Sequence, residues 1–137
     1  FHGRDIMAPV AAYLSRGEPL EKLGTPTHGP VIQDLPKIQV SENCLSGEVI
    51  HVDSFGNLIT NIHRSDWETQ QIPDGCLATC GNHQTVGLQN TYSTADPQSL
   101  IILFGSGGLL EFSIVNGNAA KHLDVQVKTA VQLNWSS

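Results

Sequence analysis

The chain has 137 residues, 39% hydrophobic and 15% charged, which is enough for one domain with a modest core. Its net charge of -6, with seven scattered lysines and arginines, argues against the basic surface that a nucleic-acid backbone requires. The longest apolar runs, about five residues, fall far short of the roughly 20 that span a bilayer. No charged-then-apolar signal segment opens the chain. We therefore expect a cytoplasmic protein that binds neither nucleic acid nor membrane.

The beginning of the chain predicts a short helix. It has an acidic start at Asp5, a proline in its first turn at Pro9 and a glycine at its end, Gly17. A second short turn is expected at Leu20–Leu23. Because Phe1 opens the chain without an initiator methionine or a polar tail, we expect the sequence to be part of a longer protein.

A change of pattern follows residues 25–36, which hold three prolines, two threonines and one glycine and predict an extended linker. Beyond it, short apolar alternations separated by Gly, Asn or Asp predict about eight strands of a closed or nearly closed antiparallel barrel. The expected strands are 37–40, 47–52, 58–62, 76–80, 84–88, 100–104, 110–115 and 125–133. Helical turns are expected at 65–71, with a capping box of Ser65 and Glu68, and at 118–123.

The cysteines do not form a recognisable metal or redox pattern. There are three of them, Cys44, Cys76 and Cys80, and the last two are separated by three residues rather than the two of a zinc or redox pair. The six histidines are dispersed along the chain. We expect reduced, mostly buried thiols and no metal site.

A hairpin at Ile50–Asn61 (IHVDSFGNLITN) concentrates polar groups on a tight turn. Asp53 at its mouth either neutralises a ligand ammonium or bonds its own backbone in an Asx turn. The amide of Asn57 offers a donor and an acceptor that suit an adenine edge, although a left-handed turn residue is the alternative. Phe55 is either a ring that stacks on a ligand or a core residue. The hairpin suits a small polar ligand.

Two later turns carry further candidate groups. Gly105–Gly108 (GSGG) follows an apolar strand, so its backbone and the Ser106 hydroxyl could hold an anion, or it is a simple hairpin turn. Asn116–Ala120 (NGNAA) is read from its residues as a strand-to-helix turn that starts a helix at Ala119.

These three segments, in this order and with Phe1–Asp5 (FHGRD) at the start, resemble the S-adenosyl-L-methionine (SAM) hydroxide adenosyltransferase family, a relative of fluorinases and chlorinases. The resemblance covers nearly all of the chain but only the second half of a family member. It implies a mainly β fold, with residues 1–24 ending an N-terminal α/β domain, 25–45 forming a linker and first strand, and 46–137 forming a barrel-like substrate-binding domain.

The resemblance implies a SAM hydrolase that forms adenosine and L-methionine, with SAM as substrate and no cofactor. By resemblance, Ser106 binds the methionine carboxylate, and Val115 and Asn116 read adenine through their main chain. Fluorinases have an arginine where this chain has Gly107, so that contact comes from backbone here or is lost. The family also implies a homotrimer whose sites lie between subunits, so that the isolated chain is inactive.

His2 is the expected catalytic residue, because family members that use water activate it with a histidine of this motif, and a neutral imidazole accepts a proton near pH 7. The alternative for His2 is a solvated terminal residue. Two other functions stay open for the whole protein: a SAM-dependent halogenase, against which His2 weighs, and a non-catalytic nucleoside-binding barrel.

Overall fold

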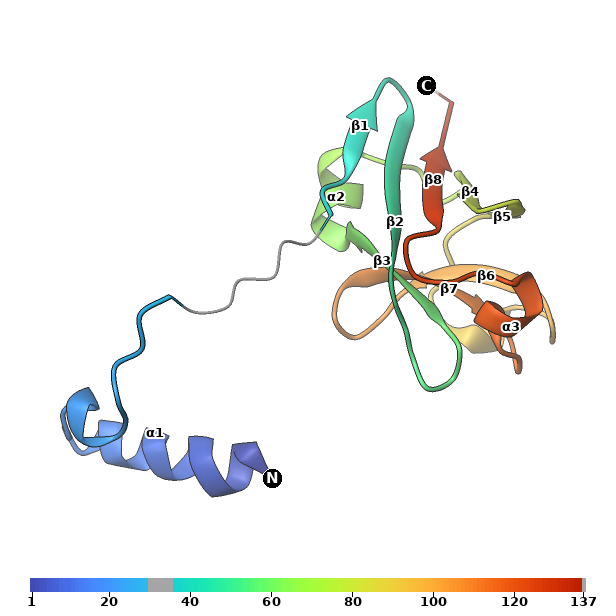
Figure 1. The fold of residues 1–137 in the computed structure, drawn as a ribbon. Coiled ribbons are helices and arrows are strands. Elements are labelled where there is room, and N and C mark those ends of the chain that lie inside the picture. Colours follow the sequence, from blue (N-terminus) through green and yellow to red (C-terminus); the bar gives the residue numbers. More distant parts are fainter. Residues whose placement is uncertain (30–35, 137) are drawn as a thin grey trace. The chain divides into compact units, whose positions relative to one another are not determined.

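A computed structural model of the chain describes residues 1–29 and 36–136, with the side chain of Thr94 left out (Figure 1). The chain divides into two compact units, Phe1–Gln33 and Asp34–Ser137. Residues 30–35 of the predicted linker at 25–36 lie outside the described residues. No helix in the described ranges has the length and apolar character needed to span a membrane.

The first unit is helical, as predicted. A π-helical turn η1 (Gly3–Met7) continues into α1 (Ala8–Ser15), and a 3-10 turn η2 (Leu20–Lys22) follows. Pro9 lies at the beginning of α1, directly after the helical residues of η1, and Gly17 takes a positive φ of 81° just beyond the end. No residue of these elements is buried.

The second unit is an eight-stranded antiparallel sheet that curls into a nearly closed barrel, which confirms the predicted fold class (Figure 1). The strand order is β5-β4-β8-β2-β3-β7-β6, with β1 added beside β2. The strands are β1 (Gln39–Ser41), β2 (Cys44–Val52), β3 (Leu58–His63), β4 (Leu77–Cys80), β5 (His83–Val86), β6 (Leu100–Phe104), β7 (Leu109–Ile114) and β8 (Ala130–Asn134).

The two ends of this sheet approach each other through the segment after β5. Leu88 forms a parallel bridge with Ile102 of β6, and the Gln89 amide donates to the Ile102 carbonyl at 2.9 Å. The Thr85 hydroxyl donates to the Leu100 carbonyl at 2.7 Å. These bonds satisfy part of the edge that an open sheet would leave unpaired.

Alternate side chains of the strands fill the barrel. Leu45, Leu58, Ile102 and Phe112 are fully buried, as the period-2 pattern of the sequence indicates. Cys76 and Cys80 belong to this core and are free thiols, and burial raises the pKa of each to about 11. These two cysteines are therefore packing residues and poor nucleophiles at neutral pH.

Two sequence expectations about helices and strand ends are wrong. Helix α2 (Arg64–Thr69) starts earlier than expected, because its capping box is made by His63 and Asp66 rather than by Ser65 and Glu68. The Ser65 amide donates to His63 Nδ1 at 3.2 Å, and the His63 amide donates to Asp66 at 2.8 Å. The expected strand 125–133 is also too long. Helix α3 (Ala119–Leu123) ends in the left-handed Asp124, and β8 begins only at Ala130.

Candidate functional site

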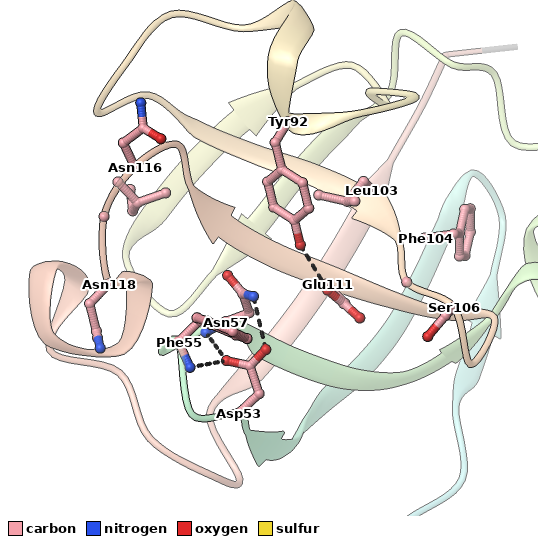
Figure 2. A pocket seen from close by; sticks show the side chains of 13 residues that line it. Asp53, Phe55, Asn57, Tyr92, Leu103, Phe104, Ser106, Glu111, Asn116 and Asn118 are labelled. Atoms are coloured by element: carbon pink, nitrogen blue, oxygen red, sulfur yellow. Dashed lines mark hydrogen bonds between the residues drawn. The ribbon is translucent and has the colours of Figure 1, made fainter.

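A pocket of about 790 Å³ lies on the outer side of the barrel, between the β2–β3 turn, the β6–β7 turn and the segment that follows β7 (Figure 2). This volume is within the range typical of small-molecule sites. Its lining residues are Asp53, Phe55, Asn57, Tyr92, Leu103, Phe104, Gly105, Ser106, Glu111, Ile114, Asn116, Gly117 and Asn118.

The β2–β3 turn is organised around the carboxylate of Asp53 (Figure 2). Oδ1 accepts hydrogen bonds from the amides of Phe55 and Asn57, both at 2.9 Å, and Oδ2 accepts one from Asn57 Nδ2 at 2.9 Å. The Asx-turn alternative is therefore correct for Asp53. It does not remove the ligand role, because each carboxylate oxygen has two lone pairs and Oδ2 has used only one.

Asp53 stays ionised under ordinary conditions. Partial burial raises its pKa, but the hydrogen bonds from Asn57, Phe55 and Gly56 outweigh burial and bring the pKa below its ordinary value. A carboxylate that is held in place by its own turn can meet a cation without first reorganising.

The two remaining sequence alternatives for this turn are wrong. Asn57 is not left-handed, because Gly56 takes the positive φ of 90°. Phe55 is not a core residue, because 74% of its side chain is exposed. Both side chains therefore line the pocket, and Asn57 keeps its carbonyl oxygen and one N–H for a ligand.

Glycine is required at position 56 for a second reason. A side chain there would overlap the amide of Asn118, the residue that caps α3 by accepting from the Lys121 amide at 2.9 Å. The Ala120 amide also donates to the Gly56 carbonyl at 3.0 Å. The start of α3 is thereby attached to the hairpin, and Asn118 becomes part of the pocket wall.

The β6–β7 turn is open by comparison. The Gly108 amide donates to the Gly105 carbonyl at 2.9 Å, and the exposed hydroxyl of Ser106 has no hydrogen-bond partner within residues 1–29 and 36–136. Ser106 lines the pocket as expected, whereas Gly107 does not. Nothing lies within 4 Å of the place that a Gly107 side chain would occupy.

The segment after β7 contributes one of its two predicted residues. Asn116, in the left-handed conformation with φ 54°, lines the pocket. Val115 is buried, and its main chain is already bonded: its amide donates to the Ser99 carbonyl at 3.1 Å and its carbonyl accepts from the Gln98 amide at 2.8 Å. Val115 lines instead a smaller hollow that shares Tyr92 and Asn116 with the main pocket.

His2 lies in the first unit, exposed, at the start of η1 and with no side-chain capping bond. Its neighbour Arg4 pairs with Asp5, with Nε donating to Oδ1 at 2.6 Å. No group of three or more His, Cys, Asp or Glu side chains within the described ranges is arranged to hold a metal ion.

Residues 47–132 match the SAM hydroxide adenosyltransferase C-terminal domain. The chain belongs to this family. It is 33% identical over 133 residues to the (R)-S-adenosyl-L-methionine hydrolase of Thermus thermophilus, covering 97% of this chain and 48% of that protein. It is 39% identical over 72 residues to a fluorinase of an Actinoplanes species, covering 50% of this chain and 24% of that protein. The chain thus spans about half the length of the hydrolase.

A crystal structure of an uncharacterised conserved protein from Thermotoga maritima has the same fold, with a TM-score of 0.71 and 30% sequence identity. It covers 98% of this chain and 52% of that structure. Membership of the SAM hydroxide adenosyltransferase family, expected from the three motifs, is therefore confirmed.

Sequence reasoning missed several pocket residues of this family member, above all Tyr92 and Glu111. Tyr92 lies in a 3-10 turn, η3 (Tyr92–Thr94), within a stretch that has no periodic pattern. Glu111 follows Leu110 in β7, and this one charge in the strand was the available signal. The Tyr92 hydroxyl donates to Glu111 Oε2 at 3.3 Å.

Proposed function

We propose that this chain forms the substrate-binding half of an enzyme that hydrolyses SAM to adenosine and L-methionine. The observation that carries the proposal is the pocket itself, because it gathers Asp53, Asn57, Ser106 and Asn116 from three separated turns. The name of the Thermus thermophilus relative, an (R)-S-adenosyl-L-methionine hydrolase, supports the same reaction.

The lining groups suit the parts of SAM. The ionised Asp53 would accept hydrogen bonds from the methionine ammonium, and the Ser106 hydroxyl would donate to the methionine carboxylate. The carbonyl oxygen of Asn57 would accept from the exocyclic amine of adenine, while Asn116, rather than Val115 with its already bonded main chain, would meet the base edge. Phe55 completes the proposed contacts with its exposed ring, whereas Gly107 does not line the pocket, so the contact expected there is lost in this proposal.

In the proposed reaction, water attacks the 5′ carbon of the ribose. A C–O bond forms as the C–S bond breaks, its electron pair stays on sulfur, and methionine leaves as a neutral thioether. Since the sulfonium is already a good leaving group, the protein's work is to align the water and to exclude the bulk solvent. The proton released by the water would pass to His2, the proposed general base.

The proposal includes a shared site. In the first unit, Ile6, Met7 and Leu20 are each more than half exposed, which supports packing of residues 1–24 against a further α/β domain. We propose a homotrimer in which such a domain of one subunit covers the barrel of another, with no separate cofactor and a cytoplasmic location. The 137 residues alone would then bind substrate weakly and be inactive.

Product analysis of the full-length protein tests this proposal. Incubation with SAM should yield adenosine and methionine by mass spectrometry, at the same rate with and without chloride. A chloride-dependent 5′-chloro-5′-deoxyadenosine product would support the halogenase, for which the likeness to a fluorinase is the favouring observation. Binding without turnover would support a nucleoside-binding barrel.

Replacing His2 tests the proposed mechanism. In the full-length enzyme, His2→Ala should lower kcat by roughly 10²- to 10⁴-fold with a smaller change in KM, as expected for the loss of a general base. Substrate binding should survive, because the pocket residues are unchanged. An unaltered kcat, or a parallel fall in melting temperature and affinity, would remove His2 from the chemistry.

A further inference from the structure

The pocket wall is acidic. Among the residues that the structure describes, its lining includes two carboxylates, Asp53 and Glu111, and no Lys, Arg or His. The ion pairs found in the described ranges all lie in the first unit. Within those ranges, Asp53 and Glu111 therefore have no salt bridge. Arg64 has its guanidinium carbon 4.4 Å from the centroid of the Phe104 ring and does not line the pocket.

Glu111 is held in a defined position. It is half-buried on β7, and the Tyr92 hydroxyl donates to its Oε2 at 3.3 Å (Figure 2). Gly105, at the end of β6, leaves the space that its carboxylate occupies, since a side chain at Gly105 would overlap Glu111 Oε1. The sequence therefore provides both a donor and a gap for this one carboxylate.

Ionised Glu111 lacks compensation in the structure. Burial raises the pKa of Glu111, and the negative charge of Asp53 raises it further. The hydrogen bond from Tyr92 lowers this pKa but does not outweigh the other two effects. A partly buried carboxylate without a cation is unfavourable, and such groups are retained where a ligand supplies the missing charge.

We infer that Glu111 determines charge specificity in this pocket: Asp53 holds the ammonium of SAM, and Glu111, oriented by Tyr92 and Gly105, faces the sulfonium. This inference rests on the proposed function. The two carboxylates match the two positive charges of the substrate. After C–S cleavage the sulfur is neutral, so the attraction to Glu111 ends and methionine is released more easily.

The kinetics of a Glu111→Gln variant should distinguish an attraction to the sulfonium from other roles of Glu111. An attraction to the sulfonium is strongest before reaction, because positive charge leaves the sulfur in the transition state. Glu111→Gln should therefore raise KM for SAM about tenfold and should raise kcat rather than lower it, because the mutant loses more ground-state than transition-state attraction. Glutamine keeps the acceptor for Tyr92 and nearly the same volume.

The deciding experiment is calorimetric titration of the full-length protein with two stable ligands. S-adenosylhomocysteine has a neutral sulfur, and sinefungin has an amine-bearing carbon in place of the sulfonium. Glu111→Gln should weaken sinefungin about tenfold and S-adenosylhomocysteine less than twofold. The matched control, Asp53→Asn, should weaken both ligands similarly, because both keep the methionine-type ammonium.

Equal losses for the two ligands in Glu111→Gln would overturn the inference and leave the proposed function standing. A wild-type protein that neither binds these ligands nor hydrolyses SAM would instead contradict the proposed function. If Glu111→Gln does not fold, the wild-type protein still gives a test. The ratio of sinefungin to S-adenosylhomocysteine affinity should rise with pH as Glu111 ionises beside Asp53 and Tyr92, and a ratio constant between pH 4 and 7 would overturn the inference.

Discussion

Two turns border the pocket, and they are built in opposite ways. The β2–β3 turn closes on itself: the Asp53 carboxylate accepts three hydrogen bonds, the Asp53 amide donates to the Asn57 carbonyl at 3.1 Å, and the Gly56 amide donates to the Asp53 carbonyl at 3.1 Å. The β6–β7 turn leaves its one polar side chain, Ser106, exposed and without a partner in the described ranges.

This difference predicts how each turn responds to substitution. In the β2–β3 turn the groups that would bind the ligand also hold the local fold, so changes there should affect stability and affinity together. In the β6–β7 turn Ser106 does no structural work, so changes there should affect affinity alone. Substitutions in the two turns, and a pH series on the two carboxylates of the pocket, test this difference.

Gly56→Ala should be the most disruptive change. The positive φ of 90° disfavours any side chain at this position, and the new methyl group would overlap the Asn118 amide. We expect a loss of about 2 to 3 kcal/mol in the free energy of unfolding. Urea denaturation followed by tryptophan fluorescence measures it, since Trp67 is buried.

Gly107→Ala in the other turn is the matched control for Gly56. Open space surrounds Gly107, and its φ is not in the left-handed region. The free energy of unfolding of the Gly107→Ala variant should therefore change by less than about 0.5 kcal/mol. Similar losses for the two alanine variants would show that the turns do not differ as described.

Asp53→Ala should come second. It should weaken SAM binding by about 1.5 to 3 kcal/mol, the range for a hydrogen bond to a charged group, and weaken adenosine binding little, because adenosine has no ammonium. It should also lower stability by about 1 kcal/mol, since Phe55 and Asn57 lose their acceptor. Calorimetry with both ligands and urea denaturation measure these effects. A similar loss for both ligands would remove Asp53 from the methionine site.

The barrel could be predicted from the sequence because its strands carry local signals. Period-2 apolar patterns and turn residues located all eight strands, and the motifs at Asp53, Ser106 and Asn116 located the turns that meet at the pocket. Strand ends were less certain where the signal depends on three-dimensional contacts. His63 was not expected as a cap, and β8 starts late because the left-handed Asp124 ends α3 and only Ala130 enters the sheet.

The pocket wall was harder to predict than its turns. Tyr92 reaches the site from a segment without periodicity, and its partner Glu111 is 19 residues away along the chain. Asn118 was seen only as part of a turn, because its contact with Gly56 exists only once α3 packs on the hairpin. Such residues share a pocket through the pairing of β3 with β7, and a single sequence does not reveal that pairing.

Ser106→Ala should come third. It should weaken SAM binding by about 0.5 to 1.5 kcal/mol, the usual value of one hydrogen bond, with S-adenosylhomocysteine affected equally because both ligands have the methionine carboxylate. The melting temperature should stay within experimental error of the wild type. A fall in melting temperature similar to that of Asp53→Ala would show that Ser106 has a structural role after all.

The smallest effect should be on the pH dependence of stability. Ionisation of Asp53 should make stability rise with pH, and ionisation of Glu111 should make it fall. The pKa of Asp53 is lowered from its ordinary value of 3.8 in the folded chain, so its stabilisation is complete above that value and is lost as pH falls through the folded pKa. The pKa of Glu111 is raised from 4.5, chiefly by burial. As pH rises, the Glu111 carboxyl therefore loses its proton at a lower pH in the unfolded chain than in the folded chain. The free energy of unfolding then falls as pH rises from about 4.5 through the folded pKa of Glu111. Urea denaturation between pH 3 and 7 should therefore show Asp53→Asn less stable than the wild type at pH 7, with the difference decreasing as pH falls below 3.8. Glu111→Gln should show the opposite trend, gaining on the wild type as pH rises, and parallel curves for the two variants would contradict this difference.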